Sequence, residues 1–270
     1  MSVADRAALP PTRLPASAAF TDAIVIARRN LLTIIRTPQL LVFSTIQPVM
    51  FVLLFRYVFG GAINVPTESY ASFLLPGVFV QTVVFGSTTA AVALAYDLKG
   101  GMIDRFRSLP MARSAVLAGR TAADAVRNLF VIMLMVAVGY AVDFRFQGGF
   151  LSAIGAMAIA LLFGYAFSWF FALMGMVASS PESAQSVGFL AIFPLTFASS
   201  AFVPTESMPD WLQAFADINP FTIVVNAVRA LWLDAPADNY IWGAFAWTIG
   251  MILVFAPLAV RAYRRAAVRA

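Results

Sequence analysis

Charged side chains divide this sequence into long apolar stretches. A hydrocarbon core about 30 Å thick takes roughly 20 helical residues to cross, and a charged side chain at its centre costs about 2.5–3.5 kcal/mol on insertion scales. Six charge-free intervals are long enough, or nearly long enough, to span it: 37–55, 69–96, 128–142, 146–181, 183–205 and 239–260. The pattern predicts an all-α membrane protein with six transmembrane helices, because the strands of a β-barrel would alternate polar and apolar residues.

Two of these intervals do not match the thickness of a bilayer. The third holds only 15 residues, so we extend its helix to about 114–142, with Asp124 at the inner border and the Arg127 guanidinium reaching toward the cytoplasmic interface. The fourth holds 36 residues, which fits a tilted helix over about 150–177. Few polar side chains remain within the spans, and none of them is ionisable: Gln47, Gln81, Thr82, Asn128, Ser168 and Thr196.

The composition supports a membrane protein and excludes several chemistries. Hydrophobic residues make up 61% of the chain and charged residues 11%, whereas ordinary domains carry about 25% charged residues. There is no cysteine for disulfides or thiolate metal sites, and no histidine, the commonest metal ligand and general base. The GxxxxGK(S/T) phosphate-binding loop is absent as well. We therefore expect no catalytic residue, no metal site and no cofactor bound by this chain.

The basic residues indicate the orientation of the chain. The net charge of +5 is explained better by arginines at membrane borders than by nucleic-acid binding. These arginines gather before the first span, between the second and third spans and in the C-terminal tail, whereas the gap 201–239 is acidic. Because basic residues stay on the cytoplasmic side, both termini are predicted to be cytoplasmic. Residues 1–16 are expected to form a flexible cytoplasmic tail, not a cleavable signal peptide, and residues 17–270 a single six-span domain.

Residues 18–36 have the pattern of an amphipathic helix. Phe20, Ile24 and Leu31 belong to its apolar face, and its charged residues are Asp22, Arg28, Arg29 and Arg36. An apolar stripe opposite arginines is typical of a helix that lies in the inner membrane interface. Such a helix is either a lever beside a soluble partner or a plain membrane anchor, and the pattern does not separate the two.

The segment 97–110 is a short cytoplasmic helix by its pattern. Gly100 and Gly101 end the second span and Pro110 closes the segment, while Met102, Phe106 and Leu109 share one helical face among the charged residues Asp104, Arg105 and Arg107. This surface could dock into a cleft of another protein or merely connect two spans at the interface.

The pattern of prolines and apolar residues over 204–235 predicts two short re-entrant or interfacial helices that form an external lid. Prolines at 204, 209 and 220 interrupt this segment. Trp211, Phe215 and Ile218 give the first piece an apolar face. The second piece, 221–233, contains Asn226 and Arg229, and the charge-free interval 218–228 is too short to span a membrane.

Three motifs resemble those of the permease subunits of type-2 ABC exporters, most closely the daunorubicin-resistance-like permeases of actinobacteria. They are Leu-Pro-Gly at 75–77, Asp-Leu-Lys-Gly-Gly-Met-Ile-Asp-Arg-Phe-Arg-Ser-Leu-Pro-Met at 97–111, and Asn-Pro-Phe-Thr at 219–222 with Ala-Val-Arg-Ala-Leu at 227–231. The resemblance covers about residues 18–260. It implies a permease of the bacterial plasma membrane that is not itself an enzyme.

The resemblance also implies partners and a cargo. A separate ATPase subunit would bind ATP and Mg, a second permease copy, identical or related, would complete the unit, and membrane lipid would surround it. The family's coupling surface carries over to Met102, Ile103, Asp104, Arg105, Phe106 and Arg107.

The expected cargo is a hydrophobic or amphipathic small molecule or lipid. The candidate path residues are Gln47, Gln81, Asn128, Ser168 and Thr196. Alternatives are a lipid-linked glycan exporter, a non-transporting membrane scaffold and a secondary transporter.

Overall fold

A computed structural model describes most of the chain. The described residues are 16–36, 38–59, 65, 67, 69–99, 113–142, 144–237 and 239–269. The predicted tail before residue 16 and the coupling residues 102–107 lie outside them.

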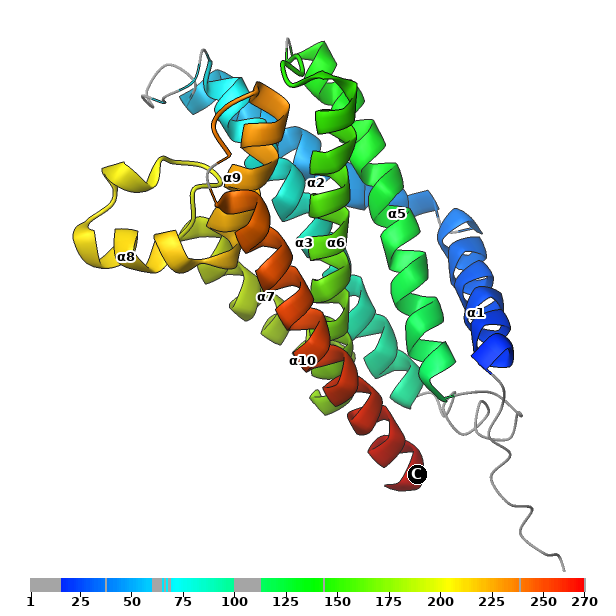
Figure 1. The fold of residues 1–270 in the computed structure, drawn as a ribbon. Coiled ribbons are helices and arrows are strands. Elements are labelled where there is room, and N and C mark those ends of the chain that lie inside the picture. Colours follow the sequence, from blue (N-terminus) through cyan, green and yellow to red (C-terminus); the bar gives the residue numbers. More distant parts are fainter. Residues whose placement is uncertain are drawn as a thin grey trace, which may run out of the picture.

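All secondary structure in the described part of the chain is helical (Figure 1). The elements are α1 (Ala16–Arg36), α2 (Pro38–Leu54), the π-helical turn η2 (Phe55–Phe59), α3 (Tyr70–Lys99), α5 (Arg113–Ala141), α6 (Gly149–Val177), α7 (Pro181–Phe197), the 3₁₀ turn η3 (Thr205–Ser207), α8 (Asp210–Ile218), α9 (Pro220–Leu233) and α10 (Tyr240–Arg269).

Local sequence explains where several of these helices begin. Proline is the first residue of α2, α7 and α9, a position where its missing N–H would have no helical partner in any case. Ser180 and Ser183 form a reciprocal capping box before α7. This cap separates α6, which lies in the overlong apolar interval 146–181, from α7, which runs into the interval 183–205.

In the described part of the chain, four helices are long and apolar enough to cross a membrane. They contain the segments Tyr70–Asp97, Val116–Ala141, Gly149–Val177 and Tyr240–Tyr263. The helices α2 and α7, at the first and fifth predicted spans, have only 17 residues each. The structure therefore supports a multi-pass helical membrane protein, and its described residues do not confirm six full spans.

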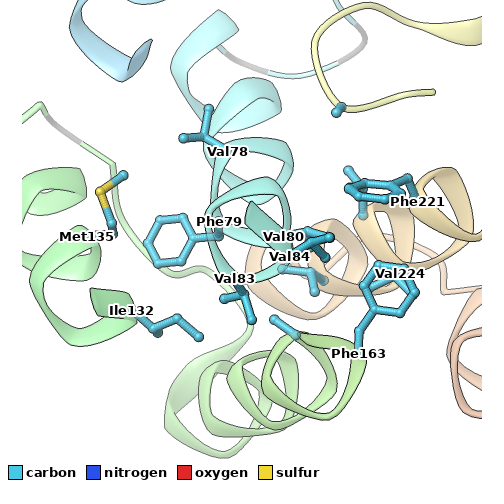
Figure 2. Packing of buried hydrophobic residues seen from close by; sticks show 14 of the residues in the cluster. Val78, Phe79, Val80, Val83, Val84, Ile132, Met135, Phe163, Phe221 and Val224 are labelled. Carbon is cyan, nitrogen blue, oxygen red and sulfur yellow. The ribbon is translucent and has the colours of Figure 1, made fainter. Parts of the chain in front are cut away.

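Helix α3 lies at the centre of the bundle. It contacts α2, α5, α6, α7 and α9. In Figure 2 its side chains face Ile132 and Met135 of α5, Phe163 of α6 and Phe221 of α9. Lipid tails are as apolar as these side chains, so close packing rather than the hydrophobic effect must hold such helices together.

The close approach of α3 and α6 depends on small residues. A Cβ atom added at Gly175 would collide with the backbone of Ala91, and one added at Gly164 would collide with the Val83 side chain. The missing side chains at these two positions therefore allow close helix packing.

The helices α8 and α9 occupy the segment predicted to form the lid. Helix α9 packs against α3, α6 and α10, whereas α8 contacts η3 and α9 and projects from the bundle (Figure 1). Its apolar residues Trp211 and Ile218 are 75% and 67% exposed. Two short helices are thus present, and their position relative to the membrane stays a prediction.

The contact between α3 and α6 leads to a stability prediction. Gly175→Ala should destabilise the protein by about 1–3 kcal/mol, because the added methyl group overpacks the interface. The measurement is the midpoint of thermal unfolding in detergent. Gly250→Ala on α10 is the control, since no described atom of a neighbouring element lies within 4 Å of the added Cβ. Equal midpoints for the two variants would contradict this packing.

Candidate functional site

Seven phenylalanines form a continuous row along one side of the bundle. Ring centroids of successive members lie 4.9–6.0 Å apart. We call this set the phenylalanine row; in spatial order it consists of Phe51, Phe55, Phe202, Phe197, Phe193, Phe189 and Phe85. Its members come from α2, η2, α3, α7 and the turn after α7, so the fold and not local sequence assembles it.

The α7 section of the row is open to the outside. Phe189, Phe193 and Phe197 follow one another at intervals of four residues, which places them on one helix face, and they are 37%, 46% and 46% exposed. They line an open groove of about 740 Å³, whose other lining residues are Ser186, Leu190 and Pro194. This groove offers aromatic and aliphatic contacts with one hydroxyl group.

The turn 198–203 carries Phe202 and is held by side chains of α3 and α9. Arg229 of α9 donates to the Ser200 carbonyl at 2.8 Å, to the Phe73 carbonyl at 3.0 Å and to Asn226 Oδ1 at 2.5 Å. Its guanidinium also lies 3.8 Å from the centre of the Phe73 ring. Sequence reasoning placed Arg229 in the external segment but gave it no role, because its partners are distant in sequence.

A charged pair lies inside the bundle, where the sequence predicted none. Asp124 and Arg127 belong to the candidate span Val116–Ala141 and are only 7% and 9% exposed. Arg127 donates to the Gly86 carbonyl and to Thr89 Oγ1 on α3, and it lies 3.7 Å from an Asp124 oxygen. The Arg127 guanidinium is thus held by α3 and Asp124 inside the bundle, and the position of this charged pair relative to the membrane interface stays a prediction.

The space for Arg127 comes from α3. A Cβ atom added at Gly86 would approach the side chains of Asn128 and Arg127. The missing side chain of Gly86 thus makes a backbone carbonyl accessible to the guanidinium. The opposite charge of Asp124 offsets part of the cost of burial. Periodicity identifies a charge on a helix, but it does not show that a neighbouring helix provides its partners.

Two of the candidate path residues meet at α6. Asn128 donates to the Val83 carbonyl at 3.2 Å and to Ser87 Oγ at 3.4 Å. The hydroxyls of Ser87 and Ser168 both donate to the Gly164 carbonyl, at 2.9 and 3.1 Å. These side chains join α3, α5 and α6 by hydrogen bonds.

The other candidate path residues lie apart from this cluster. Gln81 on α3 and Thr196 on α7 are buried, and Gln47 is exposed on α2. The structure thus brings Asn128 and Ser168 together, and it does not gather all five around one cavity among the described residues.

The ends of α3 and α5 that flank the predicted coupling segment are joined by an ion pair. Arg120 of α5 donates to Asp97 of α3. The side chains of this pair are 16% and 27% exposed, so each is largely enclosed. Figure 1 shows these helix ends at the same end of the bundle as the C-terminus of α10.

Helix α1 covers the residues predicted to form an interfacial helix, and its position relative to the membrane stays a prediction. It packs against α5, where Ile26 is buried and an added Cβ at Gly119 would collide with it. Phe20 and Ile24 are 69% and 52% exposed. Of its predicted charged residues Asp22 is partly buried, whereas the exposed ones are Arg28, Arg29 and Arg36.

Known proteins are similar to this chain over most of its length. The family profile described as ABC-2 type transporter matches residues 21–233. The chain is 39% identical over 227 residues to the daunorubicin resistance ABC transporter permease protein DrrB1 of Streptomyces coeruleorubidus, covering 84% of this chain and 80% of that protein. It is 27% identical over 265 residues to the probable doxorubicin resistance ABC transporter permease protein DrrC of Mycobacterium tuberculosis, covering 96% and 95%. It is 25% identical over 215 residues to the putative transport permease ycf38 of Cyanophora paradoxa, covering 78% and 74%.

The buried pair leads to a prediction on stability. Arg127→Met should destabilise the protein by about 3–5 kcal/mol, because Asp124 would remain buried without its cation. Adding Asp124→Asn should recover part of that loss. Thermal unfolding in detergent measures both effects, with Arg145→Met as the control at an exposed arginine. The pairing has no energetic role if the double variant is no more stable than Arg127→Met.

Proposed function

This chain belongs to the ABC-2 type transporter family, and we propose that it is the permease of an ATP-driven exporter for hydrophobic or amphipathic molecules. The cargo class is a drug-like small molecule or a lipid. The relatives whose names record daunorubicin or doxorubicin resistance make an anthracycline a suitable first probe. The chain provides the path, and a separate subunit provides ATP hydrolysis.

The observation that carries this proposal is the phenylalanine row. Aromatic faces bind planar rings by stacking and hold organic cations by cation–π attraction. A cargo that brings its own apolar surface needs few hydrogen bonds from the path, whereas a sugar chain without partners for its hydroxyls would lose hydration free energy. The groove lining of three phenylalanines, Leu190, Pro194 and Ser186 therefore favours the apolar cargo over the lipid-linked glycan.

The open side of the groove supports a second permease copy. Half of a path is formed by α7 with its exposed phenylalanines, and a second chain facing it would enclose the cargo between two such rows. The partner is then either another copy of this chain or a related permease. Membrane lipid covers the remaining exposed apolar faces.

The ATPase subunit transmits its conformational change to the path through the segment 97–110. In this mechanism closure of the ATPase dimer displaces the segment, and α3 and α5 follow as one body because Asp97 and Arg120 join them near its two ends. The equilibrium between inward- and outward-facing arrangements shifts only if ATP binds one of them more tightly. Both termini and this segment are cytoplasmic in the proposal.

The cargo assignment predicts a change in apparent affinity. Phe193→Ala should raise the apparent KM for daunorubicin about two- to tenfold, since an aromatic contact contributes about 0.5–1.5 kcal/mol beyond its area. The measurement is daunorubicin-stimulated ATPase activity of the permease–ATPase complex in proteoliposomes. Phe150→Ala, at an 83% exposed phenylalanine outside the row, is the control. The proposal is refuted if daunorubicin does not stimulate the ATPase activity of the parent complex, or if daunorubicin uptake persists without ATP. Uptake without ATP would favour a secondary transporter.

The coupling assignment predicts loss of the partner. Arg105→Glu combined with Phe106→Ala should abolish co-purification of the ATPase subunit, because it reverses a charge and removes the apolar side chain at the centre of the docking face. Arg145→Glu with Phe150→Ala makes the same two changes at exposed positions in and near the connection of α5 and α6. If the first variant still retains the ATPase and exports cargo, the coupling surface lies elsewhere.

A further inference from the structure

Among the described rings, Phe202 makes the phenylalanine row continuous. This ring stacks on Phe197 of α7 at 5.2 Å and on Phe55 of η2 at 4.9 Å, with interplanar angles of 25° and 21°. Phe202 therefore connects the α7 section of the row to the pair on α2 and η2. It belongs to the turn 198–203 and not to a helix, so helical hydrogen bonds do not fix its position.

Side chains of neighbouring helices satisfy the backbone of this turn. Asn219 donates to the Ala198 carbonyl at 2.8 Å, Arg229 to the Ser200 carbonyl at 2.8 Å, and Tyr70 to the Phe202 carbonyl at 3.1 Å. Thr222 accepts from the Ser200 N–H at 3.1 Å. Buried carbonyls without partners are costly where water is excluded, so these bonds determine which shape of the turn is stable.

Arg229 is the member of this set that ties three elements together. It starts from α9, reaches the turn at Ser200, and reaches α3 at Phe73 through Nε at 3.3 Å and Nη2 at 3.0 Å. The helical turn around Phe73 also contains Pro76, whose missing N–H leaves the neighbouring Ser72 carbonyl without its helical donor. Only a planar group with several fixed donors can serve both carbonyls and Asn226 together, and lysine has no such geometry.

We infer that Arg229 is a positioning residue that sets cargo selectivity by holding Phe202 in the phenylalanine row. The inference rests on the proposed function for its selectivity part. Arg229 does not belong to the groove lining; it acts through the turn. Without it the turn relaxes, Phe202 leaves its two stacking partners, and the row separates into two shorter sections. Phe202 is itself only 4% exposed, so it acts on the cargo through Phe197, the exposed groove ring that it supports by stacking. When Phe197 loses this support, planar aromatic cargo loses more contact than aliphatic cargo.

The first test is geometric and needs no transport. The chain has no cysteine, so Phe55→Cys with Phe202→Cys provides a single reporter pair for a short bifunctional thiol reagent in native membranes. Adding Arg229→Gln should lower the cross-linking yield severalfold, and adding Arg145→Gln should leave it unchanged. Arg229→Lys keeps the charge without the planar group and should give a yield closer to Arg229→Gln than to the parent. An unchanged yield in Arg229→Gln overturns the inference.

The second test asks whether Arg229 acts through Phe202. In the permease–ATPase complex, both Arg229→Gln and Phe202→Leu should raise the apparent KM for daunorubicin about two- to tenfold. The apparent KM for decanol, an uncharged aliphatic amphiphile with neither a planar ring nor a cation for the aromatic faces, should rise less. The double variant should show no further increase, since both changes remove the stacking of Phe202 on Phe197. Additive increases, or equal losses for both cargos, overturn the inference.

The two tests separate this inference from the proposed function. If the parent complex shows no cargo stimulation, the proposed function fails, and the cross-linking result alone decides whether Arg229 positions Phe202. If the parent is stimulated and cross-linking does not respond to Arg229→Gln, the proposed function stands and the positioning role is refuted.

Discussion

A turn that is buried in a helical bundle must take from protein groups the hydrogen bonds that water would otherwise supply, and the rest of this structure depends on how the turn 198–203 meets that requirement. Buried backbone N–H and C=O groups are almost always paired. Here Tyr70 of α3, Asn219 before α9, and Thr222 and Arg229 of α9 provide the partners. The central helix α3, helix α9 and the phenylalanine row are thereby connected through one short stretch of chain.

The same requirement explains the buried polar groups elsewhere. Arg127 reaches a carbonyl that Gly86 leaves accessible, and Ser87 and Ser168 share the Gly164 carbonyl. The Arg127 bond joins α5 to α3, and the Ser87 bond joins α3 to α6. The Ser168 bond lies within α6, at the carbonyl where Ser87 binds. Polar groups thus hold the bundle together in a solvent where apolar contact alone distinguishes poorly between helix neighbours and lipid.

Much of the fold could be predicted from charge-free intervals and from helix-breaking residues. The bounds of α5 and α6 lie within about two residues of the predicted helices 114–142 and 150–177, as expected for helix ends. The burial of Asp124 and Arg127 could not be predicted, because a single helix pattern does not reveal a carbonyl on another helix. The phenylalanine row could not be predicted either, since its members come from separate elements. The family resemblance indicated the exporter class, and the match over residues 21–233 confirms the family.

The hydrogen bonds of Arg229 have a consequence for biosynthesis. The Ser200 carbonyl and the guanidinium that binds it are 29 residues apart in sequence, and chains grow at about 5–20 residues per second. The ribosome must therefore translate α9 before the turn behind α7 can reach its final shape. During that interval the Ser200 carbonyl lacks its Arg229 donor, so the nascent chain holds this turn less firmly than the mature protein does.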